Sequence, residues 1–380
     1  MFCLRKSKNR ATINPEQLVK SPAIKIQTSI KHELITKSTI NRLIFNYSPI
    51  NYLYCVLIII SFIYRLTNYF QITIEMINKS NGISQIMDFS IEEIVIIYLI
   101  AESLNYPSKS FVNQFDSIWT QLKISTDPIV VEQLKSSNLK VQIKSTIIIL
   151  IDLAGWLFKV INMYIFSEQL NYLIYILDNS VSLLIVILNY NLFRGFLTSG
   201  CLIEIGHKRL NQLIVIQMEQ IYPSDLNFQR FRNDHYQLIV LSDLCDLRFR
   251  RFVSMICIST IPRATLIVYV AFYSNSDLIS MIKYIIWSIQ LLIVVTFFVQ
   301  CLFGFVNYPK LVVEDIYKST LIERSDYFKS EVLLLMDLIN QQLAGIRFLG
   351  LYLITSDAIN TLTTFVFTVA MAIPNFYNAK

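Results

Sequence analysis

Seven long apolar stretches constrain the fold of this chain more than any other feature of its sequence. Each is 19 residues or longer and is dominated by Ile, Leu, Val, Phe and Tyr, as an α-helix that crosses a bilayer requires. The backbone in lipid must satisfy its own hydrogen bonds, and the alternating pattern of barrel strands is absent, so helices are predicted. We place the spans at residues 50–72, 87–105, 146–168, 172–197, 252–273, 282–305 and 353–376.

The composition of the 380-residue chain favours a multi-pass membrane protein over a soluble one. Hydrophobic residues make up 54% of it and charged residues only 16%, whereas the polar domains of a single-span protein would dilute this average. The first 48 residues are basic and polar without a cleavable signal, so the first span is expected to direct insertion. The predicted fold class is all-α, with seven transmembrane helices in a lipid bilayer.

Lysine and arginine are unevenly distributed between the two sides of these spans. One side holds 26 of the 33: nine in 1–49, five in 106–145, seven in 198–251 and five in 306–352. The other side holds only Lys79 and the C-terminal Lys380. Because cytoplasmic connections are enriched in Lys and Arg, the N-terminus is predicted to be cytoplasmic and the C-terminus extracellular, opposite to a G-protein-coupled receptor. The sequon at Asn78 then lies outside as a candidate glycosylation site, although such short matches often arise by chance.

The two longest cytoplasmic connections have helical periodicity. Apolar residues recur at three- and four-residue steps through 226–251 and 329–352, and the first run continues into the fifth span without a break. We expect long helices that project below the membrane and pack on each other. The alternative is an amphipathic helix on the inner leaflet, but basic and acidic residues are poorly separated.

The last span carries its polar and small residues on one face. Steps of three and four residues, which return to the same side of a helix, connect Asp357, Thr361, Thr364, Thr368, Ala372 and Asn375. The stripe is about 27 Å long, close to the thickness of the hydrocarbon. It fits either the wall of a water-filled pore made by several copies of the helix, or a packing face of small residues.

Ionisable residues within spans are the default candidates for function, since a charge in lipid is costly. With nearby aromatic and amide residues they form a set in the second to sixth spans: Glu92, Glu93, Trp156, Lys159, Tyr175, Asp178, Arg263, Tyr269, Trp287 and Gln290. Both charge signs mixed with aromatic rings suit a small polar or amphipathic ligand. The alternative is that Lys159 and Arg263 form purely structural ion pairs with Asp178 or Glu93.

Other classes of function find little support. No acidic, His or Cys constellation has catalytic spacing, and His32, His207 and His235 are scattered through cytoplasmic segments, so no enzyme activity, metal or cofactor is expected. A transporter would show an internal repeat or matched broken helices. The net charge of +6 is spread over loops, so no nucleic-acid partner is expected.

The C-terminal residues resemble the signature of the insect gustatory receptor family. That signature is Thr-Tyr, five apolar residues and Gln-Phe; here Val369 and Asn375 stand at the Tyr and Gln positions, and Phe376 follows. Upstream, residues 345–352 (Gly-Ile-Arg-Phe-Leu-Gly-Leu-Tyr) are similar to the family's lead-in, and Gly350 keeps its spacing to the final Phe.

The resemblance, strongest over 228–376, implies a ligand-gated, non-selective cation channel in the plasma membrane. A small-molecule ligand would bind in the outer half of helices 2–6. Four identical or related subunits would meet through cytoplasmic helices and line a pore with their last helices, with Asp357 favouring cations and Asn375 and Phe376 at the outer gate. The implied domains are a cytoplasmic segment 1–49, a ligand-binding bundle 50–305, anchor helices 306–352 and a pore helix 353–376.

Alternatives remain at this point. A G-protein-coupled chemoreceptor would require the reverse orientation. Val369 departs from the family pattern, and Pro374 is expected to kink the helix near the outer mouth of the pore. Both are compatible with a non-conducting or modulatory subunit. The family also includes light-sensing and internal nutrient-sensing members.

Overall fold

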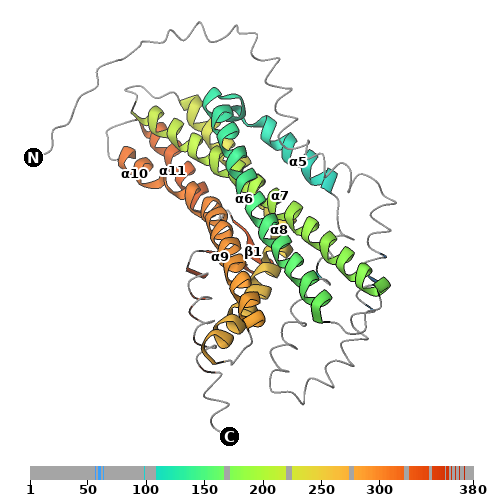
Figure 1. The fold of residues 1–380 in the computed structure, drawn as a ribbon. Helices are drawn as coiled ribbons and strands as arrows, with labels where there is room; N and C mark the ends of the chain where they lie inside the picture. The colour runs from blue at the N-terminus through green and yellow to red at the C-terminus, as the bar shows by residue number, and fades with distance from the viewer. Residues whose placement is uncertain are drawn as a thin grey trace, which may run out of the picture.

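The structure is a computed structural model that describes residues 108–166, 172–219, 225–273, 278–320, 325–341 and 345–355, with isolated helical positions at 56, 59, 60, 63, 98, 357, 358, 361, 364, 368 and 372. Its elements are α5 (Ser108–Gln121), the 3₁₀-helix η2 (Lys123–Thr126), α6 (Pro128–Phe166), α7 (Tyr172–Met218), α8 (Asp225–Tyr273), α9 (Leu278–Asn307), the 3₁₀-helix η3 (Tyr308–Lys310), α10 (Val313–Thr320), α11 (Asp326–Gln341), β1 (Arg347–Phe348) and β2 (Tyr352–Leu353). The helices dominate, which confirms the predicted all-α fold class (Figure 1).

Four long helices form the bundle and contain the predicted third to sixth spans. α6, α7, α8 and α9 have 39, 47, 49 and 30 residues, which is about 58, 70, 73 and 45 Å, whereas the hydrocarbon is about 30 Å thick. α7 and α8 therefore extend well beyond a bilayer, and α8 confirms that residues 226–251 run unbroken into the fifth span. The total of seven spans and their orientation stay predictions, because the first two spans lie almost entirely outside the described residues.

The helices pack around an aromatic core where α7, α8 and α9 meet. Phe196 of α7 is fully buried, and its ring contacts four rings of α8 and α9 at centroid distances of 5.4–6.4 Å: Phe249, Phe252, Phe298 and Phe305. Stacked, tilted and edge-to-face pairs of this kind contribute about 0.5–1.5 kcal/mol each beyond their buried area. The core thus holds α8 and α9 against the middle of α7.

Two glycines of α7 allow the neighbouring helices to approach closely. A Cβ atom at Gly200 would overlap Cys301 Sγ and lie 2.9 Å from Phe305 of α9. A Cβ atom at Gly206 would lie 2.6 Å from Leu238 of α8. Because real Cβ atoms do not approach so closely, side chains of α8 and α9 occupy the space that these two glycines leave.

A helical segment that the sequence did not predict precedes the bundle. α5 lies against α8, and η2 connects it to α6. At the start of α6, the Asp127 carboxylate accepts a hydrogen bond from the Ile129 N–H at 2.9 Å and pairs with Arg209 of α7 at 2.7 Å. The capped end of α6 is therefore attached to α7 by a partly buried ion pair.

α6 and α9 carry apolar stripes on the outside of the bundle. Exposed members recur at helical spacing: Ile143, Leu150 and Leu157 on α6, and Ile282, Ile285, Ile289 and Leu292 on α9. Among the described residues, Pro128–Phe158 and Tyr284–Lys318 are long and apolar enough to cross a membrane. Their apolar windows are only 17% and 22% buried within the chain, so these side chains require lipid or another chain around them.

The structure corrects the prediction of a helix over 329–352. The first part is right: α11 packs on α8 and buries the predicted stripe of Val332, Leu335 and Ile339. However, α11 ends at Gln341, and β1 and β2 then pair as an antiparallel hairpin. The physical reason is local, since Gly345 and Gly350 have φ angles of 145° and 81°, which an α-helix excludes.

Candidate functional site

The last helix begins directly after the hairpin. The Thr355 hydroxyl accepts a hydrogen bond from the Ala358 N–H at 3.2 Å and so caps the helix start. Leu353 lies in β2, so the predicted first residue of this span was too early by a few positions. The hairpin and the last helix are therefore neighbours in sequence, separated only by the cap.

The carboxylate and the three threonines of the polar stripe of the last helix are exposed in the single chain. Asp357, Thr361, Thr364 and Thr368 are exposed and Ala372 is half-buried. The hydroxyls of Thr361 and Thr368 donate to the carbonyls four residues earlier, both at 2.9 Å. The predicted gate residues Asn375 and Phe376 lie outside the described residues.

A half-buried polar and aromatic group lies where α6, α8 and α9 meet. Gln290 of α9 donates a hydrogen bond to the Asp152 carboxylate of α6. One turn away on α9, the ring of Trp287 lies under the Arg263 guanidinium of α8, 5.7 Å from its centroid. Three predicted ligand residues thus come together, and Asp152 joins them. The prediction omitted Asp152, although a carboxylate within an apolar span was an available signal.

Trp156 extends this group toward α7. Its indole N–H donates to the backbone carbonyl of Asn179 at 3.1 Å. The structure does not describe the side chains of the other predicted residues. Three of them lie outside the described residues: Glu92, Glu93 and Asn78. For the remaining four only the backbone is described: Lys159, Tyr175, Asp178 and Tyr269. Their membership of a ligand site stays a prediction, as does glycosylation at Asn78.

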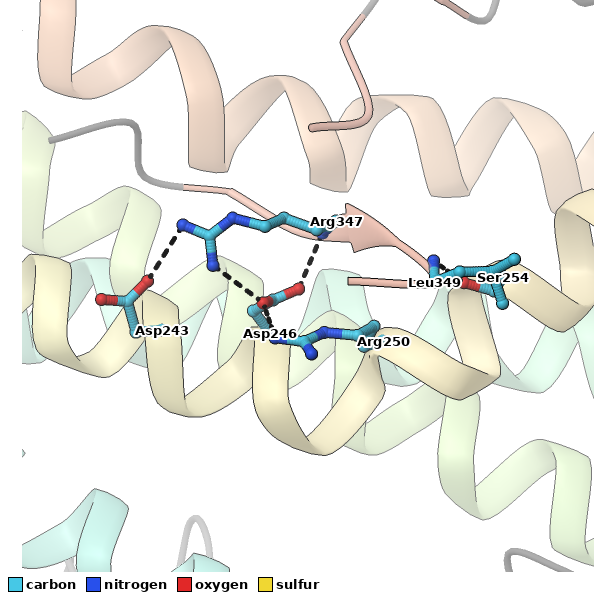
Figure 2. Close-up of polar contacts among 6 residues, drawn as sticks. All are labelled: Asp243, Asp246, Arg250, Ser254, Arg347 and Leu349. Carbon is cyan, nitrogen blue, oxygen red and sulfur yellow. Dashed lines mark hydrogen bonds and ion pairs between the residues drawn. The ribbon is translucent and has the colours of Figure 1, made fainter. Parts of the chain in front are cut away.

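A buried carboxylate attaches the hairpin to α8 (Figure 2). Asp246 Oδ1 accepts the backbone N–H of Arg347 at 2.7 Å, and its Oδ2 accepts the guanidinium groups of Arg347 at 3.2 Å and Arg250 at 2.6 Å. The bond to Asp246 raises the pKa of Arg250. Charge-assisted bonds of this kind compensate a carboxylate for the water that it loses on burial.

Three further contacts position the turn of the hairpin. The Leu349 N–H donates to Ser254 Oγ of α8 at 2.8 Å, and Arg347 lies 3.8 Å from Asp243 one turn before Asp246 (Figure 2). Gly350 packs against Arg250, since a Cβ atom added at position 350 would lie 2.7 Å from the Arg250 guanidinium. Sequence reasoning missed this contact, and the available signal was the pair of glycines five residues apart.

His207 and His235 correct the expectation that the histidines are scattered. The two rings pack edge to face between α7 and α8, with centroids 5.3 Å apart, and both side chains are buried. None of the four ring nitrogens has a hydrogen-bond partner. Burial lowers the pKa of His207 well below its ordinary value and that of His235 from 6.5 to about 4. Among the described residues no group of three or more His, Cys, Asp or Glu could hold a metal ion.

These features define a helical bundle with apolar outer faces, a polar group inside it and a last helix attached through a docked hairpin. The fold is similar to that of the insect olfactory receptor OR5 from Machilis hrabei. Its structure in complex with eugenol has a TM-score of 0.68 at 9% identity, and the alignment covers 93% of this chain and 98% of that one. A second structure of that receptor has a TM-score of 0.69 at 10% identity, covering 93% and 99%. At this identity the likeness establishes the fold. No protein-family model and no curated protein matches the sequence.

Proposed function

We propose that this protein is a chemosensory receptor of the gustatory type that acts as a ligand-gated cation channel in the plasma membrane. A small molecule binds among the outer parts of helices 2–6, and its binding opens a pore that the last helices of four identical or related subunits surround. The observation that carries the proposal is the exposed stripe of Thr361, Thr364 and Thr368 on the last helix. The fold likeness to an olfactory receptor and the C-terminal resemblance support it.

The exposure of this stripe favours a pore over a packing face within the chain. A small-residue packing face would be covered by a neighbouring helix of the same bundle, whereas Thr361, Thr364, Thr368 and also Asp357 are exposed. Polar groups at membrane depth need water or polar partners. Several copies of the helix around an aqueous path supply both, and Asp357 then contributes a ring of negative charge that favours cations.

The polar group inside the bundle supports a small polar or amphipathic ligand. Asp152, Gln290 and Arg263 offer hydrogen-bond acceptors and donors of both charge signs, and Trp287 offers a flat apolar surface. Ionisable residues within apolar spans are costly in a membrane protein and are by default candidates for function. We therefore place the ligand beside it.

Whole-cell current recordings in cells that express this chain test the proposal. Wild type, Phe376→Ala and the control Val366→Ala are compared at matched surface expression with an epitope tag at the C-terminus. The helical spacing of the sequence places Val366 off the polar stripe. We expect an accessible extracellular tag in all three and a raised basal cation current in Phe376→Ala only. The reason is that the Phe376 rings of four subunits would form an apolar constriction at the outer gate, which the substitution removes. An inaccessible tag would contradict the orientation and return a G-protein-coupled receptor to consideration. An accessible tag with no current in any variant, across a broad panel of small polar and amphipathic compounds, would contradict a channel formed by this chain alone.

A further inference from the structure

We propose that Asp246 is a positioning residue that fixes the start of the last helix to α8. Its carboxylate accepts three hydrogen bonds, two from Arg347 of the hairpin and one from Arg250 of its own helix (Figure 2). The Asp246 side chain is only 1% exposed, so water does not compete for these bonds. Hydrogen bonds that involve an ionised partner and exclude water are the strongest that a protein makes.

The contact joins two parts of the chain that are 101 positions apart in sequence. On one side is α8, a single helix that also carries Arg263 of the polar group, 17 residues and about 26 Å further along its axis. On the other side is the hairpin, which is closed at its base by a hydrogen bond from the Ile354 N–H to the Ile346 carbonyl at 2.9 Å. The cap of the last helix follows at Thr355. A displacement of α8 is thus passed through Asp246 to the first turn of the last helix.

The backbone of the hairpin turn shows that this attachment is imposed by its surroundings. Leu349 has a φ angle of 50°, in the left-handed region that leucine rarely adopts. The Leu349 N–H is held by Ser254 of α8 at 2.8 Å. Strained residues persist only where neighbouring contacts determine them, and here those contacts come from α8 on both sides of the turn.

This role deepens the proposed function and rests on it for one consequence, which is an effect on channel opening. If α8 holds the last helix in its resting position, then loosening the Asp246 contact releases that helix and raises the basal cation current. The attachment itself does not depend on channel activity, so it can be measured separately.

Hydrogen–deuterium exchange on the purified full chain in lipid nanodiscs tests the attachment. Asp246→Asn keeps the size of the side chain but removes its charge, and Asp243→Asn is the matched control. Asp243 lies one turn earlier and also faces Arg347, but at 3.8 Å and with 53% of its side chain exposed. We expect Asp246→Asn to raise exchange by about 10- to 100-fold in the hairpin, 345–355, and in the first turns of the last helix, 357–364. Asp243→Asn should leave both unchanged.

The outcomes separate this proposal from the proposed function. Faster exchange that stops at residue 355 and leaves 357–364 unchanged would overturn the positioning role, as would equal profiles for Asp246→Asn and Asp243→Asn. If Asp246→Asn does not fold, Ser254→Ala, which removes the acceptor of the Leu349 N–H and no charge, should show the same spread of exchange into 357–364. Faster exchange that reaches 357–364, without any current in wild type or in Phe376→Ala, would support the attachment and contradict a channel formed by this chain alone. A spread together with unchanged basal current in a conducting protein would overturn the gating consequence.

Discussion

Acidification should weaken the contact between α7 and α8 at His207 and His235. None of the four ring nitrogens has a hydrogen-bond partner, so no neighbouring acceptor would stabilise an imidazolium there. The pKa of His235 is about 4 in the folded protein and 6.5 in an exposed reference state. Because the folded pKa is lowered, the stability that depends on neutral His235 is complete above pH 6.5 and is lost as the pH falls toward 4.

These two pKa values set the size of the effect. Between pH 7.5 and pH 5 the protonation of His235 in the unfolded state alone lowers the free energy of unfolding by about 2 kcal/mol. His207, whose pKa is lowered as well, acts in the same direction. For a chain of this length, about 2 kcal/mol corresponds to a decrease of about 2–3 °C in Tm.

Thermal unfolding of the detergent-purified protein at pH 7.5 and pH 5 measures this, with His235→Phe as the test variant. Phenylalanine keeps the edge-to-face ring contact but cannot be protonated. Between pH 7.5 and pH 5 the Tm of the variant should therefore fall by about 2–3 °C less than the Tm of wild type. At pH 7.5 the variant should be at least as stable as wild type, since two unpaired nitrogens are removed. Tyr236→Phe, at an exposed neighbouring position, controls for the substitution itself and should follow wild type. Parallel pH profiles for wild type and His235→Phe would refute this reasoning.

Two further predictions concern glycines. Gly200→Ala should lower the free energy of unfolding by about 1–3 kcal/mol, because its methyl group would overlap Cys301 Sγ, whereas Gly155→Ala, with no atom within 4 Å, should be neutral or stabilise by up to about 1 kcal/mol. Equal Tm values for these two variants would contradict the close packing of α7 on α9. Gly350→Ala, at a φ angle of 81° and against Arg250, should destabilise the hairpin by about 1–2 kcal/mol. Limited proteolysis between α11 and the last helix measures this. A cleavage rate of the Gly350→Ala variant equal to that of wild type would contradict the prediction.

The long helices could be predicted because their signal is repeated many times. Each turn of α6 to α9 adds apolar residues with the same spacing, so a few atypical positions do not obscure the pattern. The unbroken course of α8 from residues 226–251 into the predicted fifth span was expected for the same reason. Polar residues within spans were also recognisable, and Arg263, Trp287 and Gln290 do come together.

The hairpin and the histidine pair could not be predicted in this way. Each strand of the hairpin has only two residues, and Asp246 and Ser254, which hold it, are about a hundred positions away in sequence. The contact of His207 with His235 depends on the register between α7 and α8, which no local pattern reports. Periodicity gives the face of a helix but not the residue of its neighbour that meets it.

The threonine hydroxyls of the last helix have a consequence for what a permeating ion would meet. Thr361 and Thr368 each donate their only hydroxyl proton to the carbonyl four residues earlier. Each oxygen is therefore left with lone pairs and no hydrogen to offer. In the proposed pore, four copies of each threonine form rings of oxygen that accept hydrogen bonds from water or approach a cation, but cannot donate to an anion. At these two rings the wall then disfavours anions, and this selectivity would persist in a variant in which Asp357 is neutralised.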